Sequence, residues 1–348
     1  MNEPTTPAGI DGPAITAWLS ARAPVTEPLT FSLISGGRSN LTFDVTDAAG
    51  GHWVLRRPPI GHVLATAHDM GREHRIIAAL RDTAVPVPPA IDLCTDAEVN
   101  DAPFFVMDYV DGLVLRDRAT AEQLDLDARG AAGMHLIDVL AAIHAVDPDE
   151  VGLGDLGRRE HYVERQLKRW HSQWERSAYT HVTGIDDVHG RLSAKVPEQR
   201  ESTIVHGDYR LDNCIVTPDG QIAAVLDWEL CTLGDPLADI GLLLVYWSER
   251  SDGFSAMPDS PTTVAGFPDR DQITARYAEA SGREIGDVDY FVALGYWKLA
   301  CILAGVATRY ADGQMGDDAD AAALAELFGA QIENLVVAAS GAAERSGR

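Results

Sequence analysis

The chain has 348 residues, 46% of them hydrophobic and 23% charged, a composition typical of a globular protein, and its length predicts two lobes or domains. Its 53 acidic and 28 basic residues give a formal charge of −25, a field that repels nucleic acid and anionic membranes and excludes both as main partners. This charge would suit a cationic ligand, and general solubility of the chain is the alternative.

The N-terminal segment, residues 1–27, is predicted to be a tail followed by a short helix. It has no basic region and no apolar region of the kind found in signal peptides, and we find no apolar run approaching the ~20 residues of a membrane span. The cysteines are scattered, without metal-binding spacing, which is typical of reduced thiols in a cytoplasmic protein. They are Cys94, Cys214, Cys231 and Cys301.

Strands are predicted from Phe31 onward, and the first two flank a loop of small residues. Small side chains let backbone N–H groups approach phosphate oxygens, so this loop is a candidate for binding nucleotide phosphates. An ordinary Gly-Gly turn is the alternative. The loop residues are Ser35, Gly36, Gly37, Arg38, Ser39 and Asn40.

The next strand, residues 52–57, ends on two arginines that alternation places on opposite faces. We assign Arg56 to the inner face, where its guanidinium is suited to gripping a phosphate, and expect Arg57 to point to solvent. The following helix, with an apolar stripe at Met70, Ile76, Ile77 and Leu80, carries Glu73. Glu73 is the candidate ion-pair partner of Arg56, an ordinary surface glutamate being the alternative.

A buried-type strand at 104–107 runs into Asp108, Tyr109 and Val110, which we interpret as a hinge whose backbone groups contact a nucleotide base. Beyond it the chain is predicted to be mainly helical, with a helix at 131–145.

The stretch from Arg158 to Arg176 predicts a helix with a basic face. Six Arg or Lys residues stand against three Glu residues there, and on a helix the arginines at 158, 165, 169 and 176 fall within about 40° of one another. Val163, Leu167, Trp170 and Trp174 fall on the opposite side. This basic face either meets an anionic acceptor or is a solvated surface paired with acidic neighbours.

The rest of the chain is organised around residues 204–240. After Ile204-Val205 comes His206-Gly207-Asp208, and Asn213 follows five residues after Asp208. Two apolar strands then flank the turn Pro218-Asp219-Gly220, and the second ends on Asp227. Antiparallel pairing of these strands is expected to bring Asn213 and Asp227 together. A polar hairpin with no chemistry is the alternative.

These residue types in this order suit phosphoryl transfer. Magnesium prefers oxygen ligands and keeps several waters, so the protein need supply only one or two, here Asn213 and Asp227. A separate carboxylate, Asp208, would accept a hydrogen bond from the attacking hydroxyl and position it. Arg210 is the second candidate catalytic residue, because it is close enough in sequence to reach the transferring group.

The segments HGDYRLDN and LDWELCTLGDPLADIG resemble the aminoglycoside phosphotransferase and choline kinase superfamily, and in particular the branch that also occurs fused to acyl-CoA dehydrogenases. The resemblance covers residues 33–313 and includes YVERQLKRWHSQWERS. It implies a protein-kinase-like fold, ATP, Mg²⁺ and a small acceptor that carries a hydroxyl. Protein kinases have a lysine where this chain has Arg56, a change that the resemblance implies is tolerated.

After Asp227, Gly234-Asp235-Pro236 marks a turn before an apolar helix, and Asp235 and Asp239 are expected to cap it or brace the catalytic loop. Further helices are predicted at 270–280, 289–309 and 320–339. The resemblance implies that the C-terminal helices help to form the acceptor pocket. Its candidate residues are Tyr296, Trp297, Lys298 and Arg309.

The sequence thus predicts an α+β, protein-kinase-like two-lobed fold. Residues 28–110 form a nucleotide-binding N-lobe with a small antiparallel sheet, 111–340 a mainly helical catalytic C-lobe, and 341–348 a tail. The predicted activity is ATP-dependent transfer of the γ-phosphoryl group to a hydroxyl of a small molecule, with a hydroxyacyl-CoA as one candidate acceptor. The alternatives are an antibiotic kinase of the aminoglycoside type and a nucleotide-binding pseudokinase.

Overall fold

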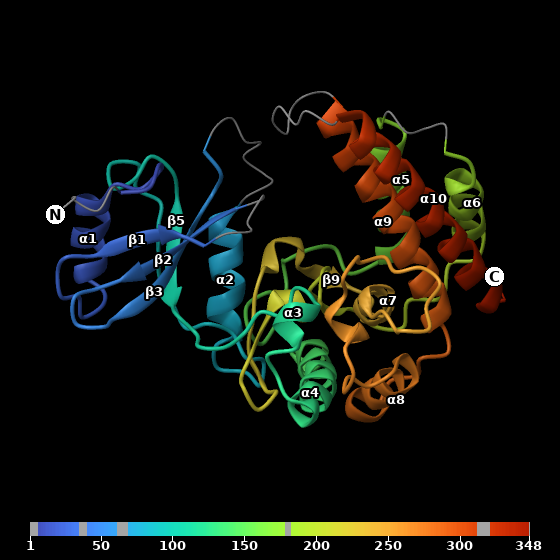
Figure 1. The fold of residues 1–348 in the computed structure, drawn as a ribbon, viewed down its shortest axis with the longest axis horizontal. Helices are drawn as coiled ribbons and strands as arrows, with labels where there is room; N and C mark the ends of the chain where they lie inside the picture. Colours follow the sequence, from blue (N-terminus) through green and yellow to red (C-terminus); the bar gives the residue numbers. More distant parts are fainter. Residues whose placement is uncertain (1–5, 35–39, 61–68, 178–181, 312–320, 348) are drawn as a thin grey trace. The chain divides into compact units, whose positions relative to one another are not determined.

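The computed structural model describes residues 6–34, 40–60, 69–177, 182–311 and 321–347. The chain forms two compact units, with the elements labelled in Figure 1. The first unit comprises Met1–Gly112 together with Ala223–Leu230, and the second comprises Leu113–Ile222 together with Cys231–Arg348. The chain therefore returns to the first unit for a short segment in the middle of the second.

The first unit is built on a five-stranded antiparallel sheet in the order β1-β2-β3-β5-β4. The small antiparallel sheet predicted from the sequence is confirmed, but β4 was not predicted, since three nearby prolines masked its start. The strands are β1 (Thr30–Leu33), β2 (Leu41–Thr46), β3 (His52–Arg57), β4 (Ala90–Cys94) and β5 (Phe104–Asp108).

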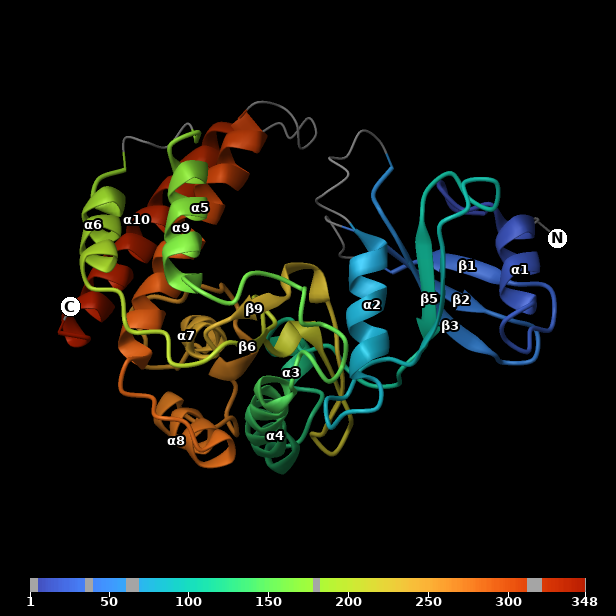
Figure 2. The same ribbon diagram turned by 180° about the vertical axis from the view of Figure 1, so that it is seen from behind.

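Helices α1 (Gly12–Ser20) and α2 (Met70–Leu80) lie on opposite sides of this sheet, as Figures 1 and 2 show. Helix α1 packs Trp18 against Phe104, with their ring centroids 5.0 Å apart. Helix α2 buries Ile76 and Leu80. Both helices begin at an aspartate whose carboxylate accepts a backbone N–H of the first turn, as N-caps do.

The prediction that Arg57 points to solvent is wrong. Its side chain is only 2% exposed, and its Nη1 lies 2.7 Å from an Asp101 carboxylate oxygen and also donates to the Gly9 carbonyl. Alternation does place Arg56 and Arg57 on opposite faces, but the second face is covered by the N-terminal segment rather than by water.

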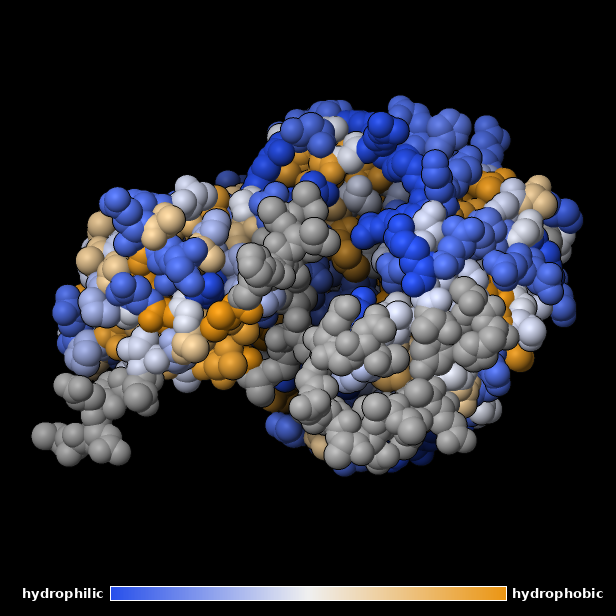
Figure 3. Space-filling view, turned by 90° about the horizontal axis from the view of Figure 1, so that it is seen from above, coloured by the Kyte–Doolittle hydropathy of each residue, from blue (hydrophilic) through white to orange (hydrophobic). Residues whose placement is uncertain are grey.

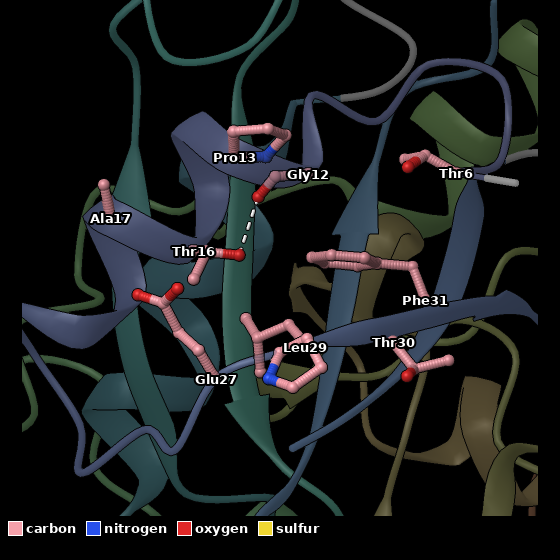
Figure 4. A pocket seen from close by; sticks show the side chains of 10 residues that line it. Thr6, Gly12, Pro13, Thr16, Ala17, Glu27, Leu29, Thr30 and Phe31 are labelled. Atoms are coloured by element: carbon pink, nitrogen blue, oxygen red, sulfur yellow. Dashed lines mark hydrogen bonds between the residues drawn. The ribbon is translucent and has the colours of Figure 1, made fainter. Parts of the chain in front are cut away.

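A cavity of about 350 Å³ lies beside α1 in the first unit (Figure 4). The side chains of Thr16 from α1, Leu29, and Phe31 from β1 face it, and Thr16 donates a hydrogen bond of 2.7 Å to the Gly12 carbonyl. None of the residues predicted for the catalytic site lines this cavity.

The second unit is mainly helical. Its helices are α3 (Arg118–Ala121), α4 (Leu126–Ala145), α5 (Tyr162–Trp174), α6 (Ile185–Ala194), α7 (Leu237–Tyr246), α8 (Arg270–Ser281), α9 (Val288–Ala311) and α10 (Ala321–Arg345). Its short strands are β6 (Thr203–Val205), β7 (Cys214–Val216) and β9 (Thr232–Gly234), with β6 antiparallel to β9. The short segment that belongs to the first unit, Ala223–Leu230, contains most of strand β8 (Ile222–Val225) and η2 (Trp228–Leu230). The α+β class is confirmed.

Helix α9 is the central helix of the second unit, packed against α5, α6, α7 and α10. In the described part of the chain, Val288–Tyr310 is the one segment long and apolar enough to cross a membrane by length and composition, which the sequence analysis did not anticipate. More than half of it is buried inside the unit, as in the core helix of a globular protein.

The described surface agrees with a composition in which 23% of the residues are charged. On the face shown in Figure 3, hydrophilic side chains predominate on both units, and hydrophobic ones form separate patches. All four cysteines are buried free thiols.

Candidate active site

The segment His206-Gly207-Asp208 follows β6 as a tight loop, and one carboxylate binds two of its backbone N–H groups. Asp239 of α7, 1% exposed, accepts hydrogen bonds from the N–H groups of His206 (2.7 Å) and Gly207 (2.8 Å). Gly207 has φ +85°, a left-handed conformation that favours glycine. The prediction that Asp239 braces this loop is confirmed.

A buried histidine contacts the carboxylate that binds the loop. His144 Nε2 lies 3.3 Å from Asp239 Oδ2, and His144 Nδ1 lies 2.7 Å from the Tyr277 hydroxyl. Burial alone would raise the pKa of Asp239, but the hydrogen bond to His144 and the loop N–H groups hold it below its ordinary value. The loop therefore rests on an ionised carboxylate.

Asp208 and Asn213 contact each other directly. The short helix η1 (Leu211–Asn213) turns Asn213 back, so that its Nδ2 donates to the Asp208 carbonyl (2.8 Å) and to Asp208 Oδ2 (3.0 Å). With the amide nitrogen facing Asp208, the amide oxygen accepts no hydrogen bond from any described residue. An amide oxygen left in this state is a suitable ligand for a hard divalent cation.

Arg210 lies between two carboxylates. Its Nε is 3.4 Å from Asp208 Oδ2 and 3.0 Å from Asp212 Oδ1, and its guanidinium lies 4.7 Å from the centroid of the Tyr246 ring. Burial raises the pKa of Asp212 to about 6 even though Arg210 opposes the change. Burial, followed by the neighbouring Asp208 carboxylate, raises the pKa of the Tyr246 phenol well above its usual range.

The sequence analysis missed Asp212 and Tyr246. Asp212 stands inside the motif already singled out, and its place between Arg210 and Asn213 could have signalled it. Tyr246 ends an apolar helix 38 positions after Asp208 and carries no local signal of a role at the site.

The first unit holds a second charged cluster, around Arg56. Its guanidinium lies 3.2 Å from a Glu73 oxygen and 3.3 Å from Asp227 Oδ1, so the predicted Arg56–Glu73 ion pair is present. Glu73 is 2% exposed, which rules out the surface alternative. Burial raises the pKa of Glu73, and Arg56 only partly offsets it. Arg56 Nε has no hydrogen-bond partner among the described residues.

Asp227 has a strained backbone. It has φ +62°, a conformation rarely adopted by residues other than glycine, and such strain gathers at functional sites. Two residues on, Glu229 accepts a hydrogen bond of 3.4 Å from the side-chain amide of Asn40, which is 2% exposed. Of the predicted phosphate loop, Asn40 is thus placed in this cluster, while Ser35, Gly36, Gly37, Arg38 and Ser39 lie outside the described residues.

The predicted hinge begins within β5, because Asp108 is the last residue of that strand, and Tyr109 and Val110 follow it. The N–H of Asp108 donates to the Pro89 carbonyl (2.9 Å) and the N–H of Tyr109 to the His52 carbonyl (3.2 Å). The Tyr109 ring also stacks on His52 at 3.6 Å between centroids. Of the three predicted hinge residues, Val110 is the one whose N–H has no hydrogen-bond partner within the described chain.

Comparison with known proteins identifies the family. The family model of the phosphotransferase enzyme family matches residues 30–280. The chain belongs to the phosphotransferase enzyme family.

Two relatives illustrate this membership, and one more distant structure shares the fold. Mouse acyl-CoA dehydrogenase family member 10 is 33% identical over 293 residues, which cover 83% of this chain but only 27% of the relative. A protein from Ralstonia eutropha JMP134, provisionally named an aminoglycoside phosphotransferase, is 30% identical with a TM-score of 0.78, covering 95% of this chain and 98% of that one. Amicoumacin kinase hAmiN, solved with AMP-PNP and Ca²⁺, shares the fold at 17% identity and a TM-score of 0.58, over 94% of each chain.

The chain therefore has the aminoglycoside kinase fold expected from the sequence, and it spans about a quarter of the length of the mouse relative. Among the described residues of this phosphotransferase, no group of three or more His, Cys, Asp or Glu side chains could hold a metal ion alone.

The basic helix is shorter than predicted. Helix α5 runs from Tyr162 to Trp174, so Arg158 and Arg176 lie outside it. The apolar side predicted from the sequence is confirmed, because Val163, Leu167, Trp170 and Trp174 are all buried. Arg169 remains exposed, with its guanidinium 4.7 Å from the Trp170 ring centroid.

Proposed function

We propose that this phosphotransferase moves the γ-phosphoryl group of ATP to a hydroxyl of a small-molecule acceptor. The observation that carries the proposal is the hydrogen-bonded pair Asp208–Asn213 on a loop braced by Asp239. A carboxylate presented in this way is suited to accept the proton of an acceptor hydroxyl as the oxygen attacks phosphorus. The related fold of a kinase solved with AMP-PNP supports a nucleotide donor.

The proposed roles follow from the contacts of each residue. Asp208 orients the acceptor hydroxyl and takes its proton, and Arg210, beside Asp208, offsets negative charge at the transferring group. Arg56, kept in place by Glu73, offsets charge on the nucleotide phosphates. Asn213 and Asp227 are the predicted ligands of Mg²⁺, which when bound neutralises charge on the phosphate oxygens.

A hydroxyacyl-CoA is the acceptor that we propose first. Its support is the similarity to acyl-CoA dehydrogenase family members, although this chain spans only a quarter of the mouse protein. An aminoglycoside or related antibiotic is the second candidate, supported by the Ralstonia relative and by the charge of −25. The exposed Arg169 of α5 favours the anionic acceptor, and the overall charge favours the cationic one.

The first test is Mg²⁺-dependent ADP release from ATP over a panel of hydroxyacyl-CoA thioesters, aminoglycosides and macrolides. Asp208→Asn should lower turnover by a factor of about 10²–10⁴, the usual contribution of a general base, with ATP affinity almost unchanged. Asp219→Asn, a change of the same kind in the hairpin turn, should be neutral.

Stimulation by thioesters alone would support the metabolic acceptor, and stimulation by aminoglycosides alone would support the antibiotic kinase. A fully active Asp208→Asn variant would refute the assignment of the base. Tight ATP binding without turnover on any acceptor would favour the pseudokinase instead.

A further inference from the structure

Lys298 is a charged residue on an otherwise apolar face of α9. Leu294 and Cys301, which lie on the same face one turn before and one turn after it, are buried, and Lys298 itself is partly buried. Its Nζ donates a hydrogen bond of 3.0 Å to the carbonyl of Gly207. Burying an ammonium group costs free energy unless it is paired, so its position against this carbonyl calls for an explanation.

The hydrogen bond holds the catalytic loop at a backbone atom that Asp239 does not contact. Asp239 accepts the N–H groups of His206 and Gly207, while Lys298 binds the Gly207 carbonyl, which belongs to the peptide group that leads into Asp208. Both polar ends of the Gly207 residue are therefore engaged. Gly207 cannot rotate about its backbone, and turn Asp208 away, without breaking one of these contacts.

The charges around the ammonium group come from three elements. Burial lowers the pKa of Lys298, the carboxylates of Asp208 in the loop and Asp239 in α7 oppose this, and Arg169 in α5 reinforces it. The Trp170 ring of α5 also faces Nζ, with its centroid 5.6 Å away, at cation–π range. The ammonium group thus lies between an aromatic face and two carboxylates, one of which is the proposed base.

We propose that Lys298 is a positioning residue for phosphoryl transfer: it fixes the Gly207–Asp208 peptide and places a compensating positive charge beside the Asp208 carboxylate. The inference rests on the proposed function, in which Asp208 is the base. It goes beyond that function because it adds a residue that lies 91 positions after Gly207 in the sequence and acts through Asp208. A lysine whose only role was packing in α9 would be replaceable by an apolar side chain of similar length.

The test compares Lys298→Met, which keeps the shape but removes the charge and donors, with Lys298→Arg, which keeps both. Lys168→Met, on the exposed side of α5, is the control for loss of one lysine. We expect Lys298→Met to lower kcat about 10²-fold, the effect of a small misplacement at a reacting centre, while KM for ATP changes less than about twofold. Lys298→Arg should recover at least part of that loss, and Lys168→Met should match the wild type.

Hydrogen exchange of the amides of residues 205–208 gives a readout that does not depend on turnover. Faster exchange in Lys298→Met, but not in Lys168→Met, would support the positioning role. This outcome would hold even if the wild type phosphorylated no acceptor in the panel. In that case the proposed function would fail and the positioning role would stand. Wild-type kcat together with unchanged exchange in Lys298→Met would overturn the inference. If Lys298→Met does not fold, Lys298→Gln takes its place with the same expectations.

Discussion

Two partly enclosed carboxylates of the second unit respond in opposite ways to their surroundings. Asp235, at the start of α7, is 6% exposed and lines a cavity of about 580 Å³. Burial raises the pKa of Asp235 from 3.8 to about 6, against a hydrogen bond from the Leu237 N–H. Asp252 is gripped by two nitrogens of Arg270 at 2.8 and 2.6 Å, and this pairing holds its pKa below 3.8 despite burial.

These shifts predict pH dependences of opposite sign. The unfolded state loses the Asp235 proton at lower pH than the folded state, so the free energy of unfolding falls as pH rises from about 4 to above 6. Asp235→Asn should therefore raise stability by about 1–3 kcal/mol at pH 7.5, and the gain should vanish near pH 4. Thermal unfolding measured from pH 4 to pH 8 checks this.

Asp252→Asn serves as the opposite case in the same series. Its ion pair with Arg270 stabilises the fold above pH 3.8 and is lost as pH falls through the lowered pKa. The variant should have a lower Tm than the wild type at pH 7.5 and approach it in acid. Two variants with the same sign of effect at pH 7.5 would contradict the assignment.

At the scale of elements, the close approach of α7 and α9 depends on two glycines, Gly241 and Gly295, and Gly241 has the closer contact. A Cβ on Gly241 would lie 2.6 Å from the carbonyl carbon and from the Cβ of Phe291, nearer than atoms can approach. Since the first of these atoms is backbone, α9 would have to shift. Helix α7 supplies Asp239 and α9 supplies Lys298, so this contact also sets the separation of the two side chains that hold the loop.

Gly241→Ala should destabilise the protein by about 1–3 kcal/mol, the usual cost of overpacking a core. It should also lower kcat, because Asp239 and Lys298, the two side chains that hold the catalytic loop, would be displaced. Gly190→Ala in α6 is the matched control, because a Cβ there meets no atom within 4 Å, and replacing a mid-helix glycine should add about 0.5–1 kcal/mol. Chemical denaturation of both variants measures the difference. Equal effects would show that the two helices can separate at little cost.

At the scale of the whole molecule, ligand binding should raise the free energy of unfolding. A ligand present at 100 times its Kd stabilises a protein by about 2.7 kcal/mol when it binds only the folded state. ATP with Mg²⁺ should therefore raise Tm, and addition of EDTA should remove most of that rise. Without metal, the nucleotide phosphates would lack this charge compensation, and Arg56, the proposed phosphate residue, is itself paired with the carboxylates Glu73 and Asp227.

Asp227→Asn should lose the Mg²⁺-dependent part of this thermal shift, because the predicted metal ligand is neutralised. Asp101→Asn is the control: it too removes a carboxylate paired with an arginine of β3, but at Arg57 rather than Arg56. Calorimetry with and without EDTA compares them. A full Mg²⁺-dependent shift in Asp227→Asn would exclude this residue as a ligand.

The sequence by itself determined what is local. The order His206-Gly207-Asp208, Asn213, Asp227 marked the candidate site, since these residues lie close together in the chain. Alternation in His52–Arg57 separated Arg56 from Arg57, because side chains of a strand alternate whatever surrounds it. The apolar stripe of α5 was also predicted from the sequence. The family resemblance rested on contiguous motifs, HGDYRLDN and LDWELCTLGDPLADIG.

Only the tertiary structure decided which distant side chains serve the site. Asp239 reaches the Gly207 N–H across 32 positions, and Lys298 reaches the Gly207 carbonyl across 91. Such contacts depend on how α7 and α9 pack, and no pattern within either helix encodes the partner. The burial of Arg57 has the same origin, since alternation assigns it a face but cannot say that the N-terminal segment covers it.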